Sequence, residues 1–110
     1  MKHAVIVSHP KRHSFTMAMA QAYRSALEER GHEVVFRDLY RMRFDPRLHA
    51  GEMPDARGFA PRPDVAAERK LLADVEAFAF FYPVWFNAPP AIHKGYVDRV
   101  FGMGFGYGMG

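Results

Sequence analysis

A strand–helix–strand pattern in the first forty residues constrains the fold most. Residues 3–8 form a short apolar run rich in β-branched side chains, which is typical of a strand buried on both faces of a parallel sheet. Residues 15–30 carry apolar side chains at helical spacing, with Ser14 as the expected N-cap and Gly31 as the residue that ends the helix. Residues 33–40 are predicted to form a second strand. Two strands joined by one helix predict a parallel pair with a right-handed crossover.

The remaining sequence continues an α/β pattern with few strands. Residues 41–64 contain four prolines and are predicted to form a long surface excursion. A helix is expected over 65–73, with Asp64 as its candidate cap, then a strand within the apolar segment 76–85 and a proline-led helix over 88–101. Three strands are fewer than an open doubly wound sheet usually has. We therefore expect an open parallel sheet with helices on both faces, truncated after the third strand and the following helix.

The composition excludes several classes of chemistry and partner. Without cysteine the chain can form no disulfide, thiolate nucleophile or cysteine-ligated zinc site, and no histidine–carboxylate cluster has convincing metal-ligand spacing. The 15 Lys and Arg exceed the 12 Asp and Glu by only 3, and this scattered excess does not indicate a nucleic-acid partner. No apolar run approaches the roughly 20 residues of a membrane span, and the N-terminus lacks the pattern of a signal peptide. We expect a cytoplasmic protein with no metal and no membrane insertion.

The loop after the first strand is the first candidate site. Ligands of parallel sheets bind beyond the carboxyl ends of the strands, where residues 9–13 place two histidines, a lysine and an arginine. The free N–H groups at the start of the next helix attract anions, and Ser14 and Thr16 add hydroxyl donors. The loop matches neither the GxxxxGK[ST] nor the GxGxxG phosphate motif. It suits a phosphate, but a solvated connection with a capping serine accounts for the same residues equally well.

The loop after the third strand is the second candidate site. Pro83, Trp85, Phe86 and Asn87 fall at the carboxyl end of that strand, where they can form a flat wall against a flat ligand. The alternative is a hydrophobic plug that covers the end of the sheet. Taken together, the two loops describe one ligand with an anionic tail and an aromatic head.

Four ordered segments carry a resemblance to a known family. They are an HxxxxSFxxA motif at 9–18, DLYxMxFDP at 38–46, PxWFxxxPAIxKGYxDRVF at 83–101 and GFGYG at 104–108. In these segments, which are spread over nearly the whole chain, the sequence resembles the flavodoxin-like NAD(P)H dehydrogenase (quinone) family. That family includes the mammalian quinone reductases and bacterial NAD(P)H oxidoreductases. The resemblance implies that residues 1–110 are the N-terminal portion of a flavodoxin-like flavin-binding domain and that the domain is incomplete.

The resemblance also implies a function. It is that of a flavin-dependent NAD(P)H:quinone oxidoreductase, which transfers hydride as an electron pair from NAD(P)H through the flavin to a quinone or similar small aromatic acceptor, by a ping-pong mechanism. The implied cofactor is FAD, with FMN as the alternative, and the implied assembly is a homodimer. Two other functions remain open: a non-catalytic regulatory subunit of a potassium-efflux system, and a general nitro- or azo-reductase. No catalytic residue is identified within this chain.

Site roles are carried over by position from the family motifs. The residues that would hold the flavin phosphates are His9, His13, Ser14, Phe15, Thr16 and Ala18. The residues that would line the flavin ring are Pro83, Val84, Trp85, Phe86 and Asn87. Tyr107 matches a family tyrosine that shapes the substrate pocket across the dimer interface. The sequence departs from the family at Thr16, where many members have asparagine, at Asn87, where an aromatic is common, and at His93, where leucine is usual.

Other charged and histidine residues are expected to have structural roles only. His3, His32 and His49 are predicted to be surface histidines. Lys94 and Asp98 have the i,i+4 spacing of a helix ion pair, and Arg99 on the same helix is expected to make surface pairs or packing contacts.

Overall fold

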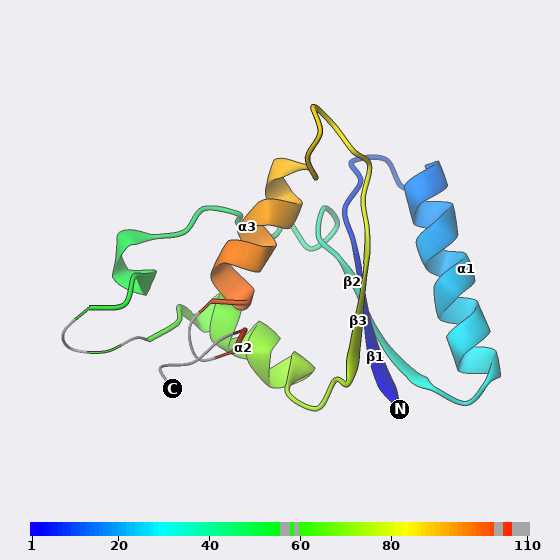
Figure 1. Cartoon of the computed structure of the whole chain (residues 1–110), viewed down its shortest axis with the longest axis horizontal. Coiled ribbons are helices and arrows are strands. Elements are labelled where there is room, and N and C mark those ends of the chain that lie inside the picture. Colours follow the sequence, from blue (N-terminus) through cyan, green and yellow to red (C-terminus); the bar gives the residue numbers. More distant parts are fainter. Residues whose placement is uncertain (56–57, 59, 103–104, 107–110) are drawn as a thin grey trace.

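The chain folds as a parallel three-stranded sheet with helices on both faces (Figure 1). The computed structural model describes residues 1–55, 58, 60–102 and 105–106. The elements run in the order β1 (Lys2–Val7), α1 (Phe15–Glu29), β2 (Glu33–Asp38), the 3-10 helix η1 (Ala50–Glu52), α2 (Pro63–Leu72), β3 (Ala77–Phe81) and α3 (Ala91–Val100). Helix α1 covers one face of the sheet, and α2 and α3 cover the other (Figure 1). The predicted fold class and the order of its elements are confirmed.

The strand order β2-β1-β3 creates a point where the chain changes direction across the sheet. From β1 the chain crosses through α1 to β2 on one side, and later returns through α2 to β3 on the other side. Val7 pairs with both Asp38 and Phe81, so all three strands end at the same edge. Ligands of open α/β sheets bind in the crevice at such a point, beyond the carboxyl ends of the strands.

Side chains of β1 alternate between two cores because successive strand residues point to opposite faces. On the α1 face the buried residues are Val5, Val7, Met17 and Ala20. On the α2 and α3 face they are Ala4, Ile6, Leu39, Phe44, Leu72, Tyr96 and Val100. The central strand is thus buried on both sides, as its uninterrupted apolar sequence predicts.

Both ends of α1 are fixed by the residues that the sequence indicates. The Ser14 hydroxyl accepts a hydrogen bond of 3.1 Å from the Met17 N–H, which satisfies one of the free donors of the first turn. Gly31 lies just beyond the helix at φ +84°, and its N–H donates to the Glu28 carbonyl at 3.0 Å. The N-terminus of α1 is therefore held at the carboxyl edge of the sheet.

A buried arginine ties the excursion between β2 and α2 to α3. Arg99 is 1% exposed and donates to the carboxylates of Glu52 and Asp64 and to the Asp45 carbonyl. The guanidinium holds the pKa of Asp64 below its usual range. Asp64 is not the N-cap that was expected, because α2 begins at Pro63 and its N-cap is Arg62. The Asp64 carboxylate still accepts from the Val65 N–H of the first turn, at 2.9 Å, and it also binds Arg99. Arg99 makes the expected ion pairs and packing contacts, but not at the surface, because the excursion folds over it.

Two further surface expectations have different outcomes. His3 is only 8% exposed, and its ring contacts that of His32 edge-to-face at 5.0 Å, so the surface assignment of His3 is wrong. The predicted Lys94–Asp98 pair does form on α3.

Within the described residues, no helix has the length and apolar character needed to cross a membrane. That same part of the chain contains no group of three or more side chains placed to hold a metal ion.

Candidate functional site

The two loops singled out in the sequence lie together at the carboxyl edge of the sheet. One follows β1 and the other follows β3, and both meet at the same end of the molecule (Figure 1). The ring of His9 in the first loop lies 6.3 Å, centroid to centroid, from the ring of Trp85 in the second. The fold therefore brings the basic loop and the aromatic loop into one candidate site.

The N-terminus of α1 supplies the part of this site that suits an anion. Among the hydrogen bonds of the described residues, none uses the backbone N–H of Phe15 or Thr16. No acidic residue occurs in the first turn of the helix. The preceding side chains of Lys11, Arg12 and His13 are exposed and basic. Free N–H groups and the helix dipole thus add to a local positive charge without an internal carboxylate to oppose them.

His9 has a defined donor role in the first loop. Its Nδ1 accepts a hydrogen bond of 3.0 Å from the Lys11 N–H. In the neutral ring the proton must then be on Nε2, which leaves that atom as a donor. The imidazole can therefore donate to an anion while its other nitrogen helps to shape the loop.

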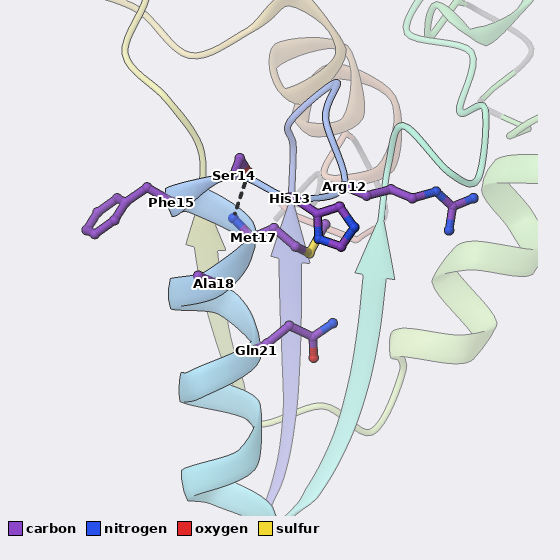
Figure 2. Close-up of a pocket in the computed structure, with 7 residues that line it drawn as sticks. All are labelled: Arg12, His13, Ser14, Phe15, Met17, Ala18 and Gln21. Carbon is purple, nitrogen blue, oxygen red and sulfur yellow. Dashed lines mark hydrogen bonds between the residues drawn. The ribbon is translucent and has the colours of Figure 1, made fainter.

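Two hollows flank the start of α1. The first, of about 580 Å³, is lined by Arg12, His13, Ser14, Phe15, Met17, Ala18 and Gln21 (Figure 2). The second, of about 380 Å³, is lined by Phe15, Thr16, Met19, Phe80, Phe81, Tyr82 and Val84. The second hollow is mostly apolar and lies between the first turn of α1 and the end of β3. In Figure 2 the Phe15 side chain points away from Arg12 and His13, and Phe15 lines both hollows.

The aromatic loop is a tight turn with a strained backbone. The N–H of Trp85 donates to the Ala88 carbonyl at 2.8 Å, and the N–H of Ala88 donates back at 3.1 Å. The two residues between them, Phe86 and Asn87, have φ values of +51° and +63°, the signs of a type I′ turn. Asparagine tolerates this left-handed region, but phenylalanine rarely adopts it. Strain of this kind is concentrated at binding sites.

The exposure of this turn argues against the hydrophobic plug. The Phe86 side chain is fully exposed and Trp85 is 42% exposed, so neither side chain is buried as a cover over the end of the sheet. Val84 is also exposed, whereas Pro83 is half-buried. An apolar wall is thus available to a ligand at the place that the sequence indicates. Tyr107, the remaining predicted site residue, lies outside the described residues.

A buried polar pair beneath the two loops was not predicted. Ser8 is fully buried at the end of β1, and its Oγ shares a hydrogen bond of 3.2 Å with Nδ1 of His93, which is 5% exposed. The His93 ring packs against Phe80 at 5.2 Å and Tyr82 at 4.5 Å, and burial lowers its pKa. The pair links the first loop to the wall of the second. The signal for it was the histidine at a position where the family pattern has leucine.

The comparisons with known proteins agree with this geometry. The chain belongs to the family described as having a flavodoxin-like fold, whose model matches residues 1–110. An uncharacterized NAD(P)H oxidoreductase of Haemophilus influenzae is 37% identical over 108 residues, which cover 97% of this chain and 54% of that protein. These matches confirm the resemblance to the flavodoxin-like NAD(P)H dehydrogenase (quinone) family that the sequence motifs indicate.

Solved structures give the same result. The NAD(P)H:quinone oxidoreductase from Methanothermobacter marburgensis has a TM-score of 0.83 and 34% identity, covering 92% of this chain and 53% of that one. General stress protein 14 from Treponema denticola, solved in complex with FMN, shares the fold at a TM-score of 0.65 and 21% identity, covering 98% of this chain and 52% of that one. The chain spans about half the length of the curated relatives it matches.

Proposed function

We propose that this chain carries the flavin-binding part of an NAD(P)H:quinone oxidoreductase. The observation that carries the proposal is the contact between the loops after β1 and β3, seen in the His9–Trp85 ring pair. It combines an anion-attracting helix end with an exposed aromatic turn at a switch point of the sheet. The names of the similar NAD(P)H oxidoreductases and NAD(P)H:quinone oxidoreductase support the same function.

The residues of the site fit the two chemical parts of a flavin. A phosphate would accept from the N–H groups of Phe15 and Thr16 and from Nε2 of His9, with added charge from the exposed basic loop. The isoalloxazine ring would lie against Trp85 and Phe86. A bound flavin supplies the two-electron chemistry, and the protein binds and orients it. The full proposed set is His9, His13, Ser14, Phe15, Thr16, Ala18, Pro83, Val84, Trp85, Phe86 and Asn87.

FAD is the proposed form of the cofactor, with FMN as the alternative. The hollow beside Ala18 lies on the basic side of the helix end and offers space for an adenylate half beyond the first phosphate. Arg12 and His13 line that hollow and suit a second phosphate. The FMN complex of the Treponema denticola protein supports the alternative through a shared fold.

The proposed substrates are NAD(P)H and a quinone, used in a ping-pong order. The nicotinamide ring of NAD(P)H and a quinone are both flat and would stack in turn on the face of the flavin ring that Trp85 and Phe86 leave free, so one must leave before the other binds. Tyr107 is proposed to complete that pocket from a second copy in a homodimer. A regulatory flavin-binding subunit and a nitro- or azo-reductase are the alternative functions that the same fold can carry.

Reconstitution of the chain with FAD or FMN tests this proposal. After unbound flavin is removed, we expect the chain to retain a yellow chromophore. In a form of the protein that spans the full length of its relatives, we expect NADPH to bleach that chromophore without oxygen and a benzoquinone to restore it. Retained colour without bleaching would favour the regulatory function, and bleaching with a strong preference for nitro- or azo-compounds would favour the other reductases. Failure to take up either flavin would overturn the proposal.

Paired variants connect this test to the site. Joint substitution of His9 and Ser14 by alanine should weaken flavin binding severalfold or more. Lys70→Ala, an exposed substitution on α2, serves as the control and should leave binding unchanged. Equal affinity of both variants would show that the phosphate site was misplaced.

A further inference from the structure

Arg41, which lies just beyond β2, reaches across to the loop that follows β1. Its Nη1 donates to the Pro10 carbonyl at 2.8 Å, and its Nη2 makes a short hydrogen bond to the His9 carbonyl. Its Nε donates to Oδ2 of Asp38 at 3.0 Å. We propose that Arg41 is a positioning residue that holds the β1 loop in the shape that binds the flavin phosphate. This inference rests on the proposed function.

The hydrogen bonds from Arg41 to the carbonyls of His9 and Pro10, here called the clamp, determine which way the backbone groups of the loop point. Two successive carbonyls, those of His9 and Pro10, are directed to a cation on the β2 side and are therefore not free to face an anion at the start of α1. The next N–H, that of Lys11, is held by the His9 ring. Three consecutive residues of the loop thus have fixed partners. A loop ordered in advance binds its ligand without first losing conformational freedom.

Asp38 anchors the clamp to the sheet. It is the last residue of β2, where its backbone pairs with Val7, the last residue of β1. Its carboxylate accepts from both Nε and the backbone N–H of Arg41, at 3.0 and 3.3 Å. The guanidinium is therefore oriented from the rigid part of the fold and transmits that orientation to the loop.

The geometry requires an arginine. Its planar guanidinium uses donors on all three nitrogens at once, toward three acceptors in different directions. A lysine would supply a single ammonium that cannot reproduce this fork. Asp38 balances the charge of Arg41, and one N–H on each of its three nitrogens is directed to Asp38 or to a carbonyl of the loop. We therefore assign Arg41 a role that acts through the backbone of the loop.

Binding of FMN and riboflavin to the 110-residue chain separates this role from a general structural one. Riboflavin lacks only the phosphate, so a clamp on the phosphate loop should matter for FMN alone. If loss of the clamp lowers the competent fraction of the loop to on the order of one tenth, Arg41→Ala raises the Kd for FMN about tenfold. The Kd for riboflavin should stay within about twofold of the wild-type value, and Arg41→Lys should resemble Arg41→Ala.

Arg47→Ala is the matched control. Arg47 also pairs with a nearby aspartate, Asp45, and its removal changes the charge equally, but it makes no hydrogen bond to the β1 loop. It should leave both affinities unchanged. FMN and riboflavin weakened alike by Arg41→Ala, or full rescue by lysine, would overturn the positioning role.

Limited trypsin digestion tests the clamp without any flavin. The β1 loop carries two exposed cleavage sites, Lys11 and Arg12. Arg41→Ala should speed cleavage there relative to both the wild type and Arg47→Ala, because the loop is no longer held. Equal cleavage rates would overturn the clamp whatever the flavin result. A wild-type chain that binds neither FMN nor riboflavin would instead overturn the proposed function, and with it the role of the clamp in phosphate binding.

Discussion

Replacing Phe86 by glycine should stabilise the fold and weaken flavin binding at the same time. Phe86 has φ +51°, a conformation that costs a residue with a Cβ about 1–2 kcal/mol. Its side chain is fully exposed, so no buried contact is lost on its removal. Glycine gains the favourable backbone geometry but orders a more flexible unfolded chain, at a cost of about 0.5–1 kcal/mol. The net gain for Phe86→Gly is therefore about 0–1.5 kcal/mol, centred near about 0.75 kcal/mol.

The effect on flavin binding has the opposite sign. Loss of an aromatic contact of the flavin ring removes about 0.5–1.5 kcal/mol, which corresponds to a Kd about two to twelve times higher. Phe86→Ala is the control that separates the two effects. Alanine keeps a Cβ in the left-handed backbone but removes the ring, so it should lower flavin affinity without the gain in stability.

Urea unfolding and FMN fluorescence titration of both variants are the required measurements. The free energy of unfolding should be higher for Phe86→Gly than for Phe86→Ala, with equal slopes against urea. Both variants should bind FMN more weakly than the wild type. A Phe86→Gly variant that is less stable than Phe86→Ala would refute the strain, and unchanged FMN affinity in both would refute the proposed contact with the ring.

Three further substitutions test contacts that support the site. Burial lowers the folded-state pKa of His93 below its ordinary 6.5, so the unfolded state takes up the proton more readily and stability falls as the pH drops below about 6.5. His93→Leu should remove that part of the pH dependence of the unfolding free energy, measured by urea unfolding between about pH 7.5 and 5.5. An unchanged dependence on pH would contradict this assignment. Arg99→Met strands the carboxylate of Glu52, which is 2% exposed, and should cost about 3–5 kcal/mol of unfolding free energy at neutral pH, whereas a loss below about 1 kcal/mol would contradict the buried pair. Ser14→Ala removes the N-cap of α1 and should cost about 1 kcal/mol in the same assay, with no loss expected if another group caps the helix.

The fold was predictable where its signals are local. The apolar run of β1, the spacing along α1, the Ser14 cap and Gly31 after the helix all lie within a few residues of the features they determine. Element ends were less accurate, because pairing and packing set them. The third strand ends at Phe81, where its pairing with Val7 ends, although the apolar sequence continues.

The position of the candidate site was also predictable, but its supporting contacts were not. Two loops that each follow a strand of one parallel sheet must share one edge, so the sequence alone brings their residue types together. The Ser8–His93 pair joins residues 85 positions apart, and the Arg99–Glu52 pair joins residues 47 apart. No local pattern relates such partners, since each residue alone is equally typical of a surface. The role of Arg41 was missed for the same reason: its acceptors in the loop after β1 are backbone carbonyls, which have no side-chain signature.

Chemical-shift mapping of FMN on the isotope-labelled chain tests the central claim most directly. If the carboxyl edge of the sheet is the flavin site, the amide shifts should concentrate in the loop after β1, the first turn of α1 and the Trp85–Ala88 turn. Amides at the opposite edge, near Lys2 and Glu76, should remain unchanged. Shifts centred on that opposite edge, or none at saturating FMN, would contradict the account.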